Sequence, residues 1–162
     1  MDKNIASNQI KLEEVKYSPA LAQGIKQKKK ERTGVCILIA ESQILSRQLM
    51  LEALRLRWNY ETIATKNAIQ TIKSYINNAP DILFLDAELS DYNGYDVLTK
   101  IKEIDVNAFV IMTSTVTLNN NVQLALKNGA QGFIAKPFTK SKIEEYINIY
   151  VDKYKKMTFN DK

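Results

Sequence analysis

The sequence predicts an α/β protein built on a doubly wound, five-stranded parallel sheet with helices on both faces. Five short apolar runs alternate with five longer stretches whose apolar residues recur at helical spacing. The runs at residues 35–40 and 82–85 show no polar alternation, which is typical of strands buried on both faces. Right-handed crossovers between parallel strands then leave few topologies.

Each element has its own local signal. The expected strands are residues 35–40, 62–65, 82–85, 109–112 and 132–135. The expected helices are residues 43–57, 68–76, 97–104, 122–126 and 143–154. Pro80 breaks the chain before the third strand, and Asn128-Gly129 provides a C-terminal cap for the fourth helix.

The chain before this pattern is basic. Residues 1–34 contain eight lysine and arginine residues against four acids, a net charge of +4 out of +5 for all 162 residues. Pro19 and Gly24 interrupt its apolar residues, so we expect a flexible extension with at most a short docking segment. The basic run at 26–32 favours a solvated linker; contact with nucleic acid, anionic lipid or an acidic partner is the alternative. We expect one domain at 35–156 and a short polar tail at 157–162.

Composition excludes several kinds of chemistry. The chain contains no histidine, which rules out Ser-His-Asp and Cys-His catalysis, imidazole zinc sites and a phosphohistidine carrier. Its single cysteine, Cys36, fits a reducing compartment and is expected to be a small buried apolar residue. No apolar run is long enough to span a membrane and no signal peptide is recognisable, so we expect a cytoplasmic protein.

Polar residues follow four of the expected strands. Glu41 and Ser42 follow the first strand, Asp86 the third, Ser114 the fourth and Lys136 the fifth. The carboxyl ends of parallel strands share one edge of a sheet, where ligands of such folds bind. Carboxylates suit a hard cation, and lysine and hydroxyl groups suit phosphate oxygens. The pattern therefore predicts a site for magnesium and a phosphoryl group.

Over residues 35–156 the sequence resembles the receiver domains of two-component response regulators, of the stand-alone, single-domain type. The resemblance rests on residues 37–41, on residues 82–86 with Gly94 eight positions later, and on Ser114. Two further glycines, Gly129 and Gly132, and the run Lys136-Pro137-Phe138 follow in order. The resemblance implies a flavodoxin-like strand order 2-1-3-4-5 and a cis peptide bond before Pro137.

The resemblance also implies a role for each site residue. Asp86 would accept a phosphoryl group from a histidine kinase or phosphotransfer protein. Mg²⁺ would be held by Glu41, Asp86 and the backbone carbonyl of Glu88. Lys136 would pair with the phosphoryl oxygens, and Ser114 and Phe133 would form the switch. Such a domain is not an enzyme in the usual sense: it catalyses at most its own phosphorylation and the hydrolysis of its aspartyl phosphate.

The signal would pass to a downstream protein through the surface of the fourth helix, the fifth strand and the fifth helix; a homodimer is a further expectation. Two positions depart from the family pattern. Ser42 stands where the family has a second acid that binds the metal, so we expect Mg²⁺ to bind weakly and Ser42 to be a doubtful ligand. Ser90 replaces a common proline. The side chain of Glu88 could return a carboxylate to the site or face solvent.

These departures keep a second hypothesis open. The chain could be a pseudo-receiver, an interaction domain of the same fold that binds its partners constitutively without metal or phosphate. The set of Asp86, Ser114 and Lys136 favours phosphorylation, whereas Ser42 favours the pseudo-receiver. A flavodoxin-like cofactor binder is disfavoured because the turn at residues 41–44 has no glycine-rich phosphate loop.

Overall fold

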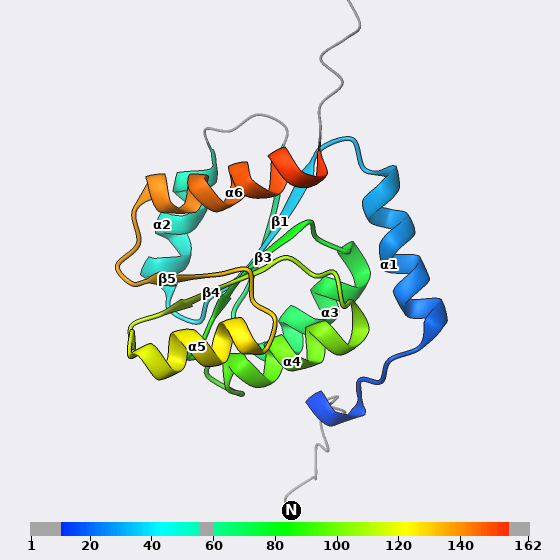
Figure 1. Ribbon diagram of the computed structural model, residues 1–162, viewed down its shortest axis with the longest axis horizontal. Coiled ribbons are helices and arrows are strands. Elements are labelled where there is room, and N and C mark those ends of the chain that lie inside the picture. Colours follow the sequence, from blue (N-terminus) through cyan, green and yellow to red (C-terminus); the bar gives the residue numbers. More distant parts are fainter. Residues whose placement is uncertain (1–10, 56–59, 156–162) are drawn as a thin grey trace, which may run out of the picture.

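The sheet of the computed structural model has the predicted strand order (Figure 1). The structure describes residues 11–55 and 60–155. Five parallel strands lie in the order β2-β1-β3-β4-β5. They are β1 (Val35–Ala40), β2 (Tyr60–Thr65), β3 (Ile82–Asp86), β4 (Val110–Ser114) and β5 (Gly132–Ala135). Strands β1, β3 and β4 are buried along their whole length, as their apolar runs predicted.

Five helices connect or follow the strands and cover both faces of the sheet. They are α2 (Ile44–Arg55), α3 (Ala68–Asn78), α4 (Gly94–Ile104), α5 (Asn119–Lys127) and α6 (Lys140–Tyr154). Residues of α3, α4 and α5 form one apolar core, and residues of α2 and α6 form the core on the opposite face. Cys36 in β1 is fully buried, as expected, and burial raises the pKa of its thiol to about 11.

The extension differs from our expectation. Its described part contains a short 3₁₀ turn at Leu12–Glu14 and an additional helix, α1 (Pro19–Glu31). Pro19 occupies the first turn, where its missing N–H costs nothing, and the hydroxyl of Ser18 accepts a hydrogen bond from the amide of Leu21 at 3.1 Å. Proline therefore starts this helix instead of interrupting the chain. Residues 1–10 of the extension and the tail at 157–162 lie outside the described residues.

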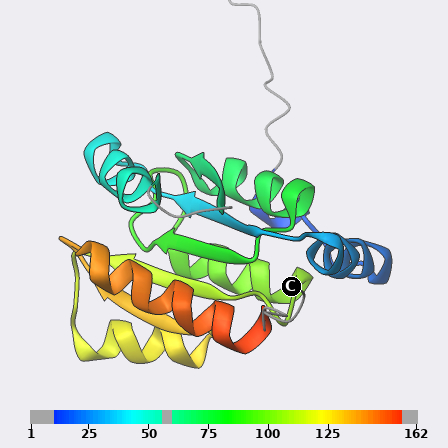
Figure 2. The ribbon, with the colours of Figure 1, turned by 90° about the horizontal axis from the view of Figure 1, so that it is seen from above.

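Helix α1 is held against the rest of the domain by its basic residues. The ammonium of Lys28 donates to the carbonyl of Asn77 at 2.7 Å, and that of Lys29 contacts Asp105 at 2.7 Å. Leu12 and Ile25 belong to the same apolar core as α3 and α4. Figures 1 and 2 show α1 at one end of the molecule. The interpretation of residues 26–32 as a solvated linker is therefore wrong.

The strand register brings the carboxyl ends of four strands to one edge. Ala40 pairs with Leu85, Asp86 with Thr113, and Ser114 with Ala135. Glu41 directly follows β1 and Lys136 directly follows β5, so both residues lie at the same edge. The peptide bond between Lys136 and Pro137 is cis, as the resemblance implied.

Candidate functional site

A lysine ammonium lies between two buried carboxylates at this edge. Nζ of Lys136 is 2.7 Å from Oε2 of Glu41 and 2.8 Å from Oδ1 of Asp86. Both acids are 1% exposed, so solvent hardly screens this arrangement. Two negative groups share one positive charge, which leaves the cluster with one net negative charge when all three are ionised. Such a site attracts a cation or a partner that brings one.

The protonation of the three groups follows from burial and from their mutual contacts. Burial opposes the charge of Asp86, but hydrogen bonds from Lys136 and from the amide of Glu88 hold its pKa below the ordinary value. Burial raises the pKa of Glu41 and outweighs the contact with Lys136. Burial also opposes the charge of Lys136, yet its ion pairs with the two carboxylates raise its pKa. Asp86 is thus the acid that stays ionised most readily.

Ser42 lies beside the carboxylate of Asp86, the predicted phosphoryl acceptor. Its hydroxyl is 3.5 Å from Oδ2 of Asp86 and 3.3 Å from the backbone carbonyl of Glu88. Both contacts are long, because hydrogen bonds between oxygen atoms are usually shorter than 3.0 Å. The hydroxyl thus sits beside two of the three groups expected to bind metal without holding either of them firmly.

The side chain of Glu88 turns into the site. Its Oε1 accepts a short hydrogen bond from the hydroxyl of Ser114, and the oxygen of this hydroxyl accepts the amide of Val116 at 2.9 Å. Glu88 is exposed as a residue, and its carboxylate nevertheless reaches Ser114 at this edge. The hydroxyl of Ser114 is thereby directed at Glu88.

The loop after Asp86 is held in place by Gly94 and by the side chain of Asp91. The amide of Gly94 donates to the carbonyl of Ala87 at 2.9 Å, and a Cβ at Gly94 would lie 2.2 Å from the carbonyl oxygen of Asp86. Asp91 accepts the amide of Ala68 at 2.8 Å and so ties the loop to the start of α3. With Ser90 in place of proline, these contacts still define the loop.

Arg47 is a site residue that the sequence reasoning missed. Its guanidinium donates to the backbone carbonyls of Glu41 at 2.7 Å and Ser42 at 3.3 Å. It therefore fixes the turn that carries both residues. The amide of Gln43 adds a hydrogen bond of 2.9 Å to Oε1 of Glu41. A lone arginine seven residues after a strand gives no sequence signal for this role, because many helices carry one on their surface.

The donor set fits Mg²⁺. Oε2 of Glu41 is buried next to Lys136 but accepts no hydrogen bond of good geometry, and Asp86 and the carbonyl of Glu88 lie close by. Proteins commonly bind Mg²⁺ through one or two carboxylates while it keeps several waters. Within residues 11–55 and 60–155, no group of three or more acidic, cysteine or histidine side chains is arranged to hold a metal. Glu41 and Asp86 supply two carboxylates, the number with which proteins commonly bind Mg²⁺.

Phe133 and the expected output surface lie along β5, α5 and α6. Phe133 is half-buried and packs against the core formed with α3, α4 and α5. Large apolar side chains are exposed on or beside α5 and α6: Val116, Leu118, Leu124, Leu126 and Ile149. In the described part of the chain, no helix is both long and apolar enough to cross a membrane.

Known proteins resemble this chain in sequence. Residues 37–148 match the family model described as "Response regulator receiver domain". The chemotaxis protein CheY of Bacillus subtilis is 31% identical over 113 residues, which cover 69% of this chain and 93% of the relative. CheY of Thermotoga maritima is 32% identical over 116 residues, covering 71% and 96%.

Solved structures show the same fold. A response regulator receiver domain protein from Clostridium thermocellum aligns with a TM-score of 0.69 at 23% identity, covering 75% of this chain and 97% of its own. The receiver domain of the sensor histidine kinase PA1611 from Pseudomonas aeruginosa, which has a magnesium ion in its active-site cleft, aligns with a TM-score of 0.67 at 20% identity. The alignment covers 74% of this chain and 99% of that one.

Proposed function

Because the chain belongs to the receiver-domain family of response regulators, we propose that it is a phosphorylation-controlled signalling receiver. In this proposal Asp86 accepts a phosphoryl group from a histidine kinase or phosphotransfer protein. The observation that carries the proposal is the position of Asp86. This buried carboxylate ends β3 and contacts the ammonium of Lys136 at 2.8 Å.

Asp86 is suited to act as the nucleophile. One oxygen, Oδ1, is fixed by Lys136 and by the amide of Glu88, whereas Oδ2 has only the long contact to Ser42. Oδ2 is therefore the oxygen free to attack. A bond forms between this oxygen and phosphorus, the bond from phosphorus to the donor nitrogen or oxygen breaks, and the donor leaves with the electron pair.

Charge on the transferred group must be offset at the same edge. Glu41, Asp86 and the backbone carbonyl of Glu88 would hold Mg²⁺, which neutralises negative charge on the phosphoryl oxygens when bound. Lys136 contributes its own positive charge, and its raised pKa keeps it protonated at neutral pH. Because Ser42 brings no charge, this chain relies on Lys136 more than a receiver with a second acid does.

Switching would begin at Ser114. To bond a phosphoryl oxygen, its hydroxyl must leave Glu88. Phe133 is half-buried on the neighbouring strand and could follow the movement of β4. The exposed apolar residues on and beside α5 and α6 then form the surface that a downstream protein recognises. A change of this kind is a shift between two populations of one domain.

A constitutive pseudo-receiver remains the second candidate, and one observation favours it. Lys136 pairs with both acids, and the carboxylate of Glu88 accepts a hydrogen bond from the hydroxyl of Ser114. The polar groups at this edge thus have partners within the chain. In that case the exposed apolar surface of α5 and α6 would bind its partner in the absence of phosphate.

The mass of the intact protein tests the proposal. The full chain is incubated with Mg²⁺ and a small acyl-phosphate donor, beside Asp86→Asn and the matched variant Asp96→Asn. Asp96 lies in the first turn of α4 and is exposed. We expect the parent chain and Asp96→Asn to gain one phosphoryl group, and Asp86→Asn to gain none.

Two other results would count against the proposal. If Asp86→Asn gained a phosphoryl group, another residue would be the acceptor. No gain in the parent chain at any Mg²⁺ concentration would favour the pseudo-receiver, and binding of partners from solution without a phosphoryl donor would then establish it.

A further inference from the structure

A cavity of about 620 Å³ lies between α1 and the body of the domain. Its walls come from three parts of the chain: the segment leading into α1 with α1 itself, the turn after α4, and the end of α6. Asp81, which precedes β3, also lines it. The cavity is therefore at the amino ends of the strands, opposite to the edge that carries Asp86. Its volume is within the range of pockets that bind small ligands.

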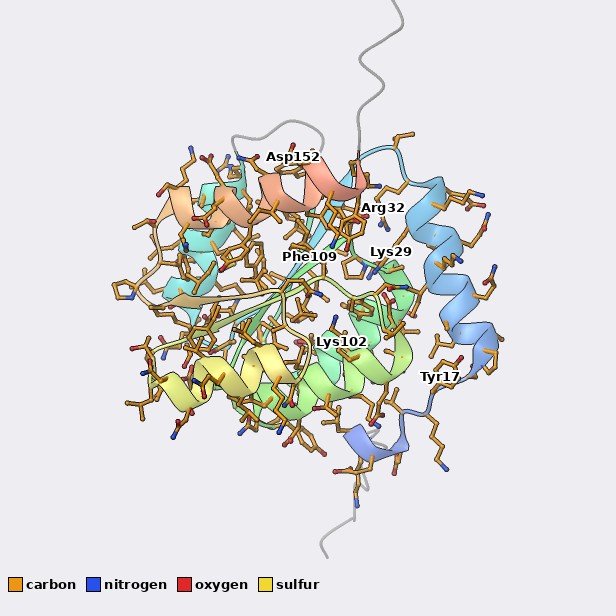
Figure 3. The ribbon with its side chains drawn as sticks, in the orientation of Figure 1. Tyr17, Lys29, Arg32, Lys102, Phe109 and Asp152 are labelled. Atoms are coloured by element: carbon orange, nitrogen blue, oxygen red, sulfur yellow. The ribbon has the colours of Figure 1, made fainter. Side chains whose placement is uncertain are left out.

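Helix α1 presents two different faces. Leu21, Ile25 and Lys28 form the face that packs on the apolar core and on α3. Ala22, Lys26 and Lys30 line the cavity from the neighbouring face. Figure 3 shows the side chain of Lys29 between α1 and the rest of the molecule, with Tyr17 at the other end of the helix. The first face holds the helix in place, and the second is left to form a wall.

Large apolar side chains remain exposed around this cavity. Tyr17 is 56% exposed, Val106 is 76% exposed and Tyr154 is 49% exposed, and all three line it. They come from three separate segments of the chain. Exposed apolar groups that converge on one hollow indicate a binding site more strongly than the same groups scattered over a surface.

Some charged side chains that line the cavity are in ion pairs, and others are not. Asp105 pairs with Lys29, Glu103 pairs with Lys100, and Asp81 pairs with both Arg32 and Lys155. Among the residues that the structure describes, the side chains of Lys26 and Lys30 have no ion-pair or hydrogen-bond partner. They stand one helical turn apart on the cavity face, so two positive charges are available together.

We propose that this cavity binds a small anion with a flat aromatic body, the chemistry of a nucleotide. The exposed ring of Tyr17 offers a stacking surface for the aromatic body, beside the ring of Tyr154, which already packs on Tyr150. Lys26 and Lys30 offer charge-assisted hydrogen bonds to a phosphate group. The site is separate from Asp86 and involves none of the residues assigned to phosphoryl transfer.

Calorimetric titration of the full chain tests the proposal, with AMP, inorganic phosphate and octathymidylate as probes. We expect AMP to bind with saturation, and the double variant Lys26→Gln/Lys30→Gln to weaken this binding about tenfold or more. The matched control Lys73→Gln/Lys127→Gln removes the same charge from α3 and α5, outside the cavity, and should leave it unchanged. Tyr17→Ser should also weaken binding, and because Tyr17 is exposed the variant should still fold.

No saturable binding of millimolar AMP, or binding that Lys26→Gln/Lys30→Gln leaves unchanged, would overturn the proposal. Inorganic phosphate that binds as tightly as AMP would overturn the role of the aromatic body. Both AMP and octathymidylate combine an aromatic body with phosphate. Far tighter binding of octathymidylate would support the proposal and assign the site to single-stranded nucleic acid. Equal or weaker binding of octathymidylate would assign the site to a free nucleotide.

Discussion

Ser42 determines how much negative charge surrounds Asp86. With a hydroxyl at this position, Glu41 and Asp86 share the positive charge of Lys136. The hydroxyl is 3.5 Å from Asp86, too far for a strong hydrogen bond. A carboxylate there would add a third acid to a site with one cation. Like charges at such distances repel, and a divalent cation relieves the repulsion.

Ser42→Asp should therefore tighten Mg²⁺ binding about tenfold or more, because affinity for hard cations follows the number of charged ligands. The free energy of unfolding without metal should fall, because the new carboxylate is added beside two others. Titration with Mg²⁺ by calorimetry measures the first effect, and urea unfolding with and without Mg²⁺ measures the second.

Thr99→Asp is the matched control, since Thr99 is exposed in the middle of α4 and adds the same charge elsewhere. It should change neither quantity appreciably. Equal Mg²⁺ affinity of Ser42→Asp and the parent chain would show that position 42 does not approach the metal.

Two glycines in helices, Gly94 and Gly24, differ in how closely other atoms approach them. Gly94 begins α4 where the backbone of Asp86 and Ala87 passes so close that a Cβ would lie 2.2 Å from a carbonyl oxygen. Gly24 is inside α1, and a Cβ there would meet no atom within 4 Å. The first glycine allows a close approach of two backbones next to the site. The second only weakens its helix.

Gly94→Ala should lower the free energy of unfolding by about 1–3 kcal/mol or more, because backbone atoms cannot move aside as side chains do. It should also slow phosphorylation, since the loop after Asp86 must shift. Gly24→Ala, the matched change, should raise the free energy of unfolding by about 0.5–1 kcal/mol. Urea denaturation of both variants checks the sign; a stable Gly94→Ala chain would contradict the close approach.

The strands and the helices between them could be predicted from the sequence, because the helices carry apolar residues at helical spacing and the buried strands are continuous apolar runs. The buried runs of β1 and β3 have no other reasonable explanation. Helix α1 could not be predicted in this way: its apolar residues are few, and Pro19 and Gly24 suggest a break. Its stability depends on partners such as Asp105, which is more than seventy residues away in the chain.

The candidate site was predictable in its composition but not in its contacts. The order of Glu41, Asp86, Ser114 and Lys136 along the chain indicates which groups meet, because parallel strands end at one edge. The direction of a side chain such as Glu88 depends on rotamers and on neighbours from other strands, which sequence spacing does not determine. The same holds for Arg47, whose role is to hold backbone carbonyls.

At the scale of the molecule, buried charges join the beginning and the end of the described chain. Asp81 is almost fully buried, and its carboxylate contacts Arg32 at 3.1 Å, Lys155 at 3.5 Å and the hydroxyl of Tyr150 at 2.8 Å. Asp105 makes a second junction, with Lys29 and with the hydroxyl of Tyr75, each at 2.7 Å. Removing one partner of such a cluster leaves a buried charge without compensation.

The stability of the molecule should depend on the ionisation of Asp105. Burial opposes the charge of this carboxyl, but Lys29 and Tyr75 hold its pKa below the ordinary value. A folded pKa below that of the unfolded chain stabilises the protein at every pH above about 4. The contribution is lost as the pH falls from there through the folded pKa. Asp105→Asn should therefore be less stable than the parent chain at neutral pH, and the difference should shrink in acid.

Urea unfolding between neutral pH and pH values below about 4 measures this difference. Asp152→Asn is the matched control, because Asp152 is exposed on α6. Its difference from the parent chain should stay small and constant with pH. A difference for Asp105→Asn that does not change with pH would rule out the ionised carboxylate as its source.

The contacts of α1 also constrain the order in which the chain can fold during its synthesis. Helix α1 leaves the ribosome before the rest of the domain, yet a helix of 13 residues is only marginally stable by itself in water. The groups that hold it, around Asn77, Asp81 and Asp105, are synthesised later, and Lys155 later still. Helix α1 therefore docks only after these later segments have been made, and a nascent chain carries it exposed until then.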